Sequence, residues 1–257
     1  MSDVAYTFEW YGEFLDELRD HGCRFKGYDT ALEAGDVVLR HDVDWSPRRA
    51  LQTARMEAER DIEATYFFLV ATPFYNLSHK PNREILSRIA SLGHDVGLHF
   101  STHQHWNEEP PQSALLAAVD SERQLLARTG PDPVDAVSFH RPPEWVFRRS
   151  FPTFTSTYAE RFFSEVAYRG DSNQRWRDVH PLDDGVPETM QVLTHPGLWG
   201  WRDGTFEERL ATVTDTRLAR TRRFMFEQFV EKKYNIDEFC DFEDLSPRRS
   251  KPAPNPQ

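Results

Sequence analysis

Short apolar segments alternate along this 257-residue chain with segments of helical periodicity, and this alternation most constrains the fold. Segments typical of buried strands, rich in β-branched and aromatic residues, lie at 37–43, 64–70, 95–99, 136–139, 162–167 and 190–194. Helical segments between the first four of them lie at about 46–60, 82–92 and 112–129. Strands that are joined through helices pair in parallel, so the order predicts an α/β fold around a parallel sheet, closed or open.

Further helices are predicted on either side of this pattern. Thr7 is a suitable cap for a helix to about Asp20, with Gly22 just past its end, and a long helix is predicted from about 206 to 234. No internal repeat and no linker divides the body, so we expect one domain over residues 1–245. The tail at 246–257 is rich in proline and charge and is predicted to be disordered.

The charge balance and the two cysteines exclude several classes of protein. The formal net charge is -11 and the acidic residues are scattered, which argues against a nucleic-acid partner. Cys23 and Cys240 stand far apart and outside any CxxC spacing, which excludes a cysteine zinc site. No stretch reaches the roughly 20 apolar residues of a membrane helix, and no basic segment followed by an apolar core opens the chain. We therefore expect a cytoplasmic protein without a membrane span.

A pair of carboxylates stands at the end of the first buried segment. In a strand, side chains alternate in direction, so Asp42 and Asp44 share one face while His41 and Val43 point to the other. Two such carboxylates repel each other unless one is neutralised or both share a cation. Ligands of parallel α/β folds bind at the carboxyl ends of the strands, which makes this pair a candidate site.

Two histidines follow another strand at a spacing that suits a metal. His99 and His103 point the same way if the segment makes one helical turn, as neutral imidazole ligands must. With one carboxylate from the first motif they would form a site of two histidines and one carboxylate with an open position for water. His105 is the alternative second ligand, and the same spacing also occurs by chance.

Three more polar residues follow predicted strands. Arg141 comes just after 136–139 and precedes two prolines, and an arginine there can hold a carboxylate ionised. His195 follows the last strand as a candidate general acid, and Asp171 would orient it and raise its pKa. Read alone, the Arg-Pro-Pro segment is typical of a turn, Asp171 of a capped turn and His195 of a loop histidine.

Tryptophans gather in the same loops. Trp145, Trp176 and Trp199 offer aromatic faces that suit sugar rings at the mouth of a site. Tryptophans in long loops are equally often packing anchors.

Taken in order, these motifs resemble those of the NodB-homology polysaccharide deacetylases, carbohydrate esterase family 4, over about residues 35–200. The corresponding segments here are His41–Asp44, His99–His103, Arg141–Pro143, Asp171–Trp176 and Leu193–His195. The resemblance implies a distorted (β/α) barrel of about seven strands and a divalent metal held by one aspartate and two histidines. Val43 separates two aspartates that are adjacent in the family, and Glu144 stands where the family has an aromatic residue.

On this resemblance we predict a metal-dependent hydrolase that removes an N-acetyl group from an amino sugar in a glycan or glycan precursor. Asp44, His99 and His103 would hold the metal, with zinc expected first and cobalt, nickel or iron also suited to the ligand set. Asp42 would be the base that activates water. Because both carboxylates share one face of the strand, their two roles are exchangeable at this stage.

The remaining residues complete the predicted mechanism. Arg141 would keep Asp42 ionised, and His195, oriented by Asp171, would protonate the leaving amine. Two alternatives stay open: a metal-dependent amidase that acts on a non-sugar amide, and a non-catalytic carbohydrate-binding homologue.

Overall fold

A computed structural model describes residues 4–232 of the chain. Its strands are β1 Arg24–Lys26, β2 Asp36–Val43, β3 Thr65–Phe68, β4 Asp95–Phe100, β5 Ala136–Phe139, β6 Thr155–Ser156, β7 Ala167–Gly170 and β8 Met190–Thr194. Its α-helices are α1 Phe8–Asp20, α2 Pro47–Ala58, α3 Lys80–Ser91, α4 Gln112–Ala127, α5 Glu160–Phe163 and α6 Phe206–Phe229. Short 3-10 helices are η1 Thr102–Gln104, η2 Glu144–Val146, η3 Ser172–Arg177 and η4 Pro196–Leu198.

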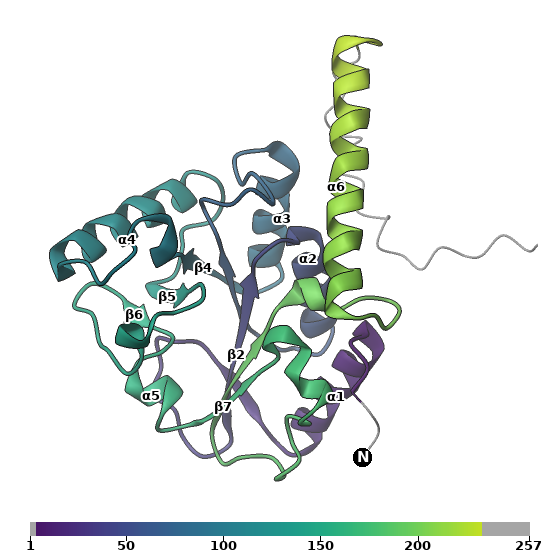
Figure 1. The fold of residues 1–257 in the computed structure, drawn as a ribbon. Helices are drawn as coiled ribbons and strands as arrows, with labels where there is room; N and C mark the ends of the chain where they lie inside the picture. The colour runs from purple at the N-terminus through teal and green to yellow at the C-terminus, as the bar shows by residue number, and fades with distance from the viewer. Residues whose placement is uncertain (1–3, 233–257) are drawn as a thin grey trace, which may run out of the picture.

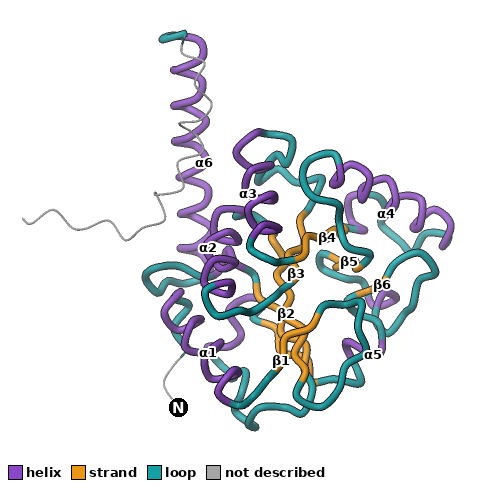
Figure 2. Tube along the Cα trace, turned by 180° about the vertical axis from the view of Figure 1, so that it is seen from behind, coloured by secondary structure: helices purple, strands orange, loops and turns teal. Residues whose placement is uncertain are grey.

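The strands form one sheet with helices packed around it (Figure 1). Its order is β6-β5-β4-β3-β2-β8-β7, β1 pairs with β2, and every pairing is parallel. The predicted α/β fold with a parallel sheet is therefore confirmed. Within residues 4–232 the order ends at β6 and β7 without a pairing between them, so the sheet is a half-barrel. Figure 2 shows the strands in the centre and the helices outside them.

Strand β2 lies at the middle of the sheet and all eight of its residues are buried. Its neighbours are β3 and β8, and His41 is in register with Tyr66 on one side and with Thr194 on the other. This register brings His195, the residue after β8, to the same end of the sheet as Asp42. The polar residues that follow separate strands in the sequence thus meet at one edge.

Local signals place the helices. Thr7 caps α1 by accepting a hydrogen bond from the Trp10 amide at 3.1 Å, and Ser46 caps α2 ahead of Pro47. The predicted strand at 162–167 is wrong over most of its length, because Phe162 lies in the short helix α5 and β7 begins only at Ala167. The aromatic side chain that favoured a strand is instead a buried core residue.

Helix α6 extends well beyond the rest of the molecule (Figure 1). A capping box fixes its start, since the Thr205 hydroxyl accepts from the Glu208 amide and the Glu208 carboxylate accepts from the Thr205 amide. The predicted continuation of this helix to residue 234, the domain boundary at 245 and the tail at 246–257 lie outside the described residues. No helix in the described part of the chain is both long and apolar enough to cross a membrane.

Candidate active site

A pocket of about 390 Å³ opens at the carboxyl ends of the strands. Residues in its wall lie at or just after the ends of five strands, β2, β4, β5, β7 and β8. They are Asp42, Asp44, His99, His140, Arg141, Ser172 and His195. The strand ends thus converge on one concave site, as expected for a parallel α/β fold.

Three potential metal ligands lie together in this pocket: Asp44, His99 and His140. Asp44 Oδ1 lies 3.2 Å from His99 Nε2 and 3.0 Å from His140 Nδ1, and the two ring nitrogens are 3.2 Å apart. Asp44 Oδ1 is buried and has no well-formed hydrogen bond. A buried carboxylate oxygen without a partner, facing two imidazole nitrogens, fits a divalent metal held by two histidines and one carboxylate.

The hydroxyl of Ser138 determines which tautomer of His99 faces this cluster. Ser138 Oγ donates to Asp42 Oδ1 at 2.8 Å, because an ionised carboxylate only accepts. The single hydroxyl proton is then used, so His99 Nδ1, which lies 2.8 Å from Ser138 Oγ, must donate to that oxygen. His99 Nε2 is left with its lone pair directed at the cluster, as a metal ligand requires.

His103 lies outside the cluster. It belongs to η1, is exposed, and its Nε2 lies 3.0 Å from the Arg141 carbonyl oxygen. The predicted helical turn from His99 to His103 does not form, because β4 stays extended through Phe100 and only residues 102–104 are helical. His105, the other candidate, lies 2.6 Å from Glu122 of α4 and is likewise not in the cluster.

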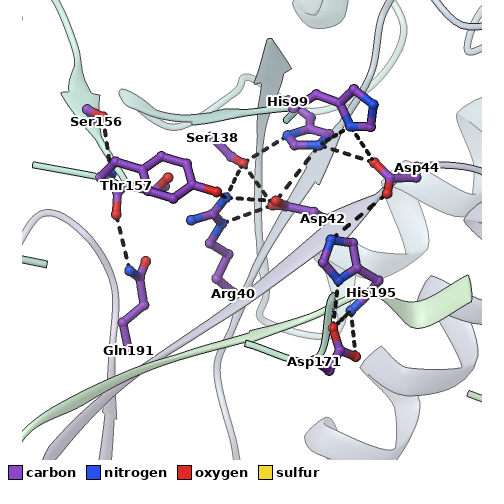
Figure 3. Close-up of polar contacts among 12 residues, drawn as sticks. Arg40, Asp42, Asp44, His99, Ser138, Ser156, Thr157, Asp171, Gln191 and His195 are labelled. Carbon is purple, nitrogen blue, oxygen red and sulfur yellow. Dashed lines mark hydrogen bonds and ion pairs between the residues drawn. The ribbon is translucent and has the colours of Figure 1, made fainter. Parts of the chain in front are cut away.

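Asp42 is held by an arginine that the sequence reading overlooked. Arg40 Nε and Nη2 donate to the two Asp42 carboxylate oxygens at 3.0 and 2.7 Å (Figure 3). Burial raises the pKa of Asp42, but the Arg40 charge outweighs it and, with His99, brings the pKa to about 2. The sequence does contain a signal for this contact. Side chains alternate along β2, so Arg40, two residues before Asp42, lies on the same face of the strand.

Arg141 does not take the predicted place beside Asp42. It is exposed, has a positive φ of 45°, and contributes its backbone carbonyl to His103. Its side chain lines the pocket instead.

Burial tends to raise the pKa of Asp44 as well. The proximity of His140 and His99 and the charge of His195 outweigh burial and hold the pKa of Asp44 well below its usual range. Asp44 therefore stays ionised at the centre of the site.

His195 and Asp171 form a second acid-base pair on the other side of Asp44. His195 Nδ1 lies 2.6 Å from Asp171 Oδ1, and His195 Nε2 lies 3.9 Å from Asp44 Oδ2. Burial lowers the pKa of His195, but the charges of Asp171, Asp44 and Asp42 outweigh it and raise that pKa to about 9. His195 is therefore protonated at neutral pH, with Nε2 directed toward the pocket.

The predicted tryptophans do not line the site as aromatic faces. Trp176 and Trp199 are 2% and 0% exposed and pack in the core, so neither offers a ring to a ligand. Trp199 instead supports the acid-base pair, since its Nε1 donates to Asp171 Oδ2 at 2.9 Å. Trp145 lies in η2, half-buried, beneath the guanidinium of Arg149.

Comparisons with known proteins give structural neighbours only. No protein-family model matches the chain, and a search of curated proteins finds no match. A CE4 esterase structure from Streptococcus mutans is 16% identical, with 87% of this chain and 89% of that chain covered and a TM-score of 0.43. A family 4 acetyl xylan esterase from Clostridium thermocellum, in complex with a cobalt ion, is 13% identical over 72% of this chain and 84% of that chain, with a TM-score of 0.39.

A CE4 family pseudoenzyme from Bacillus anthracis is also similar, at 14% identity and a TM-score of 0.41. The match covers 72% of this chain and 60% of that chain, so this chain spans less than two thirds of that protein. In structure, the chain is thus similar to carbohydrate esterases of family 4 and to a pseudoenzyme of that family, the family that its motifs resemble.

Proposed function

We propose that this chain is a metal-dependent hydrolase that removes an N-acetyl group from an amino sugar. The observation that carries the proposal is the cluster of Asp44, His99 and His140, with a buried carboxylate on one side of it and a protonated histidine on the other. Hydrolysis of an amide needs a polarised carbonyl, a base for water and an acid for the amine, and this pocket offers a group for each.

Asp44, His99 and His140 would hold the metal, so His140 takes the role that the sequence assigns to His103. A bound divalent ion polarises the acetyl carbonyl and lowers the pKa of its water from about 15.7 toward about 7. Zinc suits these ligands best, and cobalt, nickel and iron also accept them.

Asp42 is the proposed base. Arg40 and Ser138 hold its carboxylate ionised and in a fixed orientation, with Asp42 Oδ2 at 3.8 Å from His99 Nε2. Because the pKa of Asp42 is about 2, it is a weak base, and it accepts a proton only from a water that is already acidified.

His195 is the proposed acid. Asp171 binds Nδ1, so the proton that His195 can give up is the one on Nε2, which faces the pocket. Donation of this proton to the departing nitrogen releases the sugar as an amine, and general acid-base steps are typically worth about 10²- to 10⁴-fold. Arg141, exposed in the wall of the pocket, is assigned to substrate binding rather than to Asp42.

The proposal is tested by acetate release from N-acetylated sugars together with elemental analysis of the purified protein. Asp42→Asn should retain the metal and lose activity, whereas Asp44→Asn should lose both. Loss of metal in Asp42→Asn and its retention in Asp44→Asn would exchange the two roles. No acetate from any N-acetylated sugar, with metal fully bound, would refute the proposed reaction and favour the binding homologue.

Two histidines provide a matched pair of variants for the ligand set. His140→Ala should reduce metal occupancy to near zero, because it removes one of three converging donors. His103→Ala should leave occupancy unchanged, since His103 is exposed, lies outside the cluster and directs its Nε2 to the backbone carbonyl of Arg141. The opposite result, with metal lost from His103→Ala alone, would restore the assignment made from the sequence.

A further inference from the structure

A second cavity, of about 700 Å³, lies next to the catalytic pocket and shares Trp45 with it. It is formed by the start of α2, by the loop after β3 and by one face of α6. Figures 1 and 2 both show α6 beside α2 and α3. We call this cavity the arginine cleft, after the five arginines in its wall: Arg48, Arg49, Arg209, Arg217 and Arg220.

The arginine cleft is positively charged, whereas the whole chain has a net negative charge. The whole chain carries 42 acidic and 31 basic residues, yet the described residues that line this cleft include no aspartate or glutamate. A concave surface of one sign focuses the field and raises the local concentration of oppositely charged ligands. The composition of the wall thus favours an anion.

Two of these arginines are anchored by backbone carbonyls. Arg49 Nη1 donates to the Gly197 carbonyl, and Arg209 Nη2 donates to the carbonyls of Tyr6 and Arg202. Arg209 is only 8% exposed, and its Nε is buried without a partner. Arg49 and Arg209 line the same cleft and carry like charges, and burial together with this repulsion lowers the pKa of Arg49 to about 10. An anion with more than one negative charge would relieve that repulsion.

The face of α6 that lines the arginine cleft is mainly polar, and Val213 and Phe224 are its apolar members. Arg209, Thr212, Thr216, Arg217 and Arg220 recur at intervals of three, four or one residues and share this face. Guanidinium groups bind phosphate in a bidentate manner, and hydroxyls are common additional donors.

The walls of the arginine cleft and of the catalytic pocket belong to the same chain segments. Trp45 follows Asp44 directly, and Gly197, the partner of Arg49, stands two residues after His195. A ligand in the cleft therefore contacts the segments that carry the metal-binding carboxylate and the acid. Trp201 and Phe74, each 45% exposed, also line the cleft and offer rings for stacking.

Resting on the proposed function, we propose that the arginine cleft binds the phosphate groups of the substrate, which is then a phosphate or diphosphate ester of an N-acetylated amino sugar. The sugar lies in the catalytic pocket and the phosphates lie beyond Trp45. A neutral glycan would offer no negative charge to this positively charged wall.

Binding is measured first, without reference to turnover. The full-length protein is titrated with inorganic pyrophosphate and followed by calorimetry, and the titration is repeated in Asp44→Asn to remove binding through the metal. Arg217→Gln and Arg49→Gln should each weaken binding about tenfold or more, because each removes a charged hydrogen-bond donor.

Arg222→Gln is the matched control, because Arg222 lies on α6 but does not line the cleft. Equal affinities in Arg217→Gln, Arg49→Gln and Arg222→Gln, or no binding by the unaltered protein, would overturn the proposal.

Turnover then identifies the ester. Acetate release is compared for N-acetylglucosamine, its 1-phosphate and its uridine diphosphate derivative, with an N-acetylated uronic acid as the carboxylate probe. We expect kcat/KM at least about tenfold higher for a phosphorylated sugar, and we expect Arg217→Gln to reduce this preference through KM. A higher kcat/KM for the uridine diphosphate derivative than for the 1-phosphate would assign Trp201 and Phe74 to the base.

Failure of the substrate assignment is distinct from failure of the proposed function. If the free sugar or the uronic acid is as good a substrate as the phosphates, the phosphate assignment is wrong while the hydrolase stands. If no sugar releases acetate from the metal-loaded protein, the proposed function falls, and pyrophosphate binding that depends on Arg217 and Arg49 supports the anion site alone.

Discussion

At the scale of single residues, one hydroxyl orients two groups of the candidate site. Ser138 lies on β5, and its Oγ contacts Asp42, His99 and Arg40 at 2.7–2.8 Å. It donates a hydrogen bond to the Asp42 carboxylate and accepts one from the His99 imidazole, so the proposed base and a proposed metal ligand are oriented by the same atom. Partners of this kind fix the tautomer of a ligating histidine and raise its basicity.

Ser138→Ala should therefore weaken metal affinity about 10- to 100-fold without unfolding the protein. The buried methyl group leaves His99 Nδ1 without its acceptor, so the tautomer with a free Nε2 is no longer favoured. Metal titration against a competing chelator measures the change. Ser172→Ala, in the wall of the same pocket, is the control and should bind metal normally. Equal affinities in the two variants would contradict the role of Ser138.

At the scale of elements, one buried carboxylate ties α2 to three neighbours. Glu57 accepts hydrogen bonds from Tyr11 of α1 and Tyr66 of β3, each at 2.6 Å, and lies 2.9 Å from His41 Nε2 of β2. Burial raises the pKa of Glu57, but the charge of His41 and these hydrogen bonds outweigh it, so that pKa is lowered. His41 also contacts Thr194, which links this network to β8.

Glu57→Gln should lower the free energy of unfolding by about 1–3 kcal/mol at pH 7, because an amide replaces the buried carboxylate that accepts hydrogen bonds from two tyrosine hydroxyls. A carboxyl with a lowered pKa in the folded state stabilises the protein above its unfolded pKa of about 4.3. That contribution is lost as the pH falls through the lower folded value. Urea unfolding at pH 7 and near pH 4 should show the difference between Glu57→Gln and the unaltered protein shrinking. Glu59→Gln, exposed just past the end of α2, should have no such effect at either pH.

The starts of elements could be predicted from the sequence because their signals are local. Thr7 and Ser46 cap helices through atoms three residues away, and the short apolar segments read as strands from a few residues each. The strand predicted at Phe162 is wrong because a buried aromatic residue gives the same sequence pattern in a short strand and in a single helical turn.

The site could be predicted only in part, for the same reason. Asp42, Asp44 and His195 stand out in the sequence because each lies at or just after the end of a predicted strand, but the partners of these residues depend on packing across strands. His140 joins Asp44 only through the position of β5 beside β4, and no spacing in the sequence encodes that distance. The expected pair of His99 and His103 relied on a helical turn that the end of β4 does not make.

At the scale of the whole molecule, a metal at the proposed site would connect the loops that follow β2, β4 and β5. Asp44 and His140 directly follow β2 and β5, and His99 lies near the end of β4, so all three stand at one end of a sheet that is open between β6 and β7. Binding energy gained by the folded state alone adds directly to stability.

Removal of the metal should therefore lower the Tm. At a metal concentration about 100 times Kd the gain is about 2.7 kcal/mol, which for a domain of this size corresponds to roughly 5–10 °C. Thermal unfolding with zinc and with excess chelator measures the shift. His140→Ala should show almost none of it and His103→Ala should show all of it. An equal shift in both variants would indicate binding elsewhere.

The pairing of β2 with β8 also limits when the candidate site can form during synthesis of the chain. His41 of β2 and Thr194 of β8 are 153 residues apart in sequence, yet they touch across the middle of the sheet. At a synthesis rate of roughly 5–20 residues per second, β2 emerges from the ribosome roughly 8–30 s before its partner. During that interval Asp42 and Asp44 are present without His195, so a nascent chain holds half of its active site for most of its synthesis. The candidate site can therefore assemble only after β8 has been synthesised.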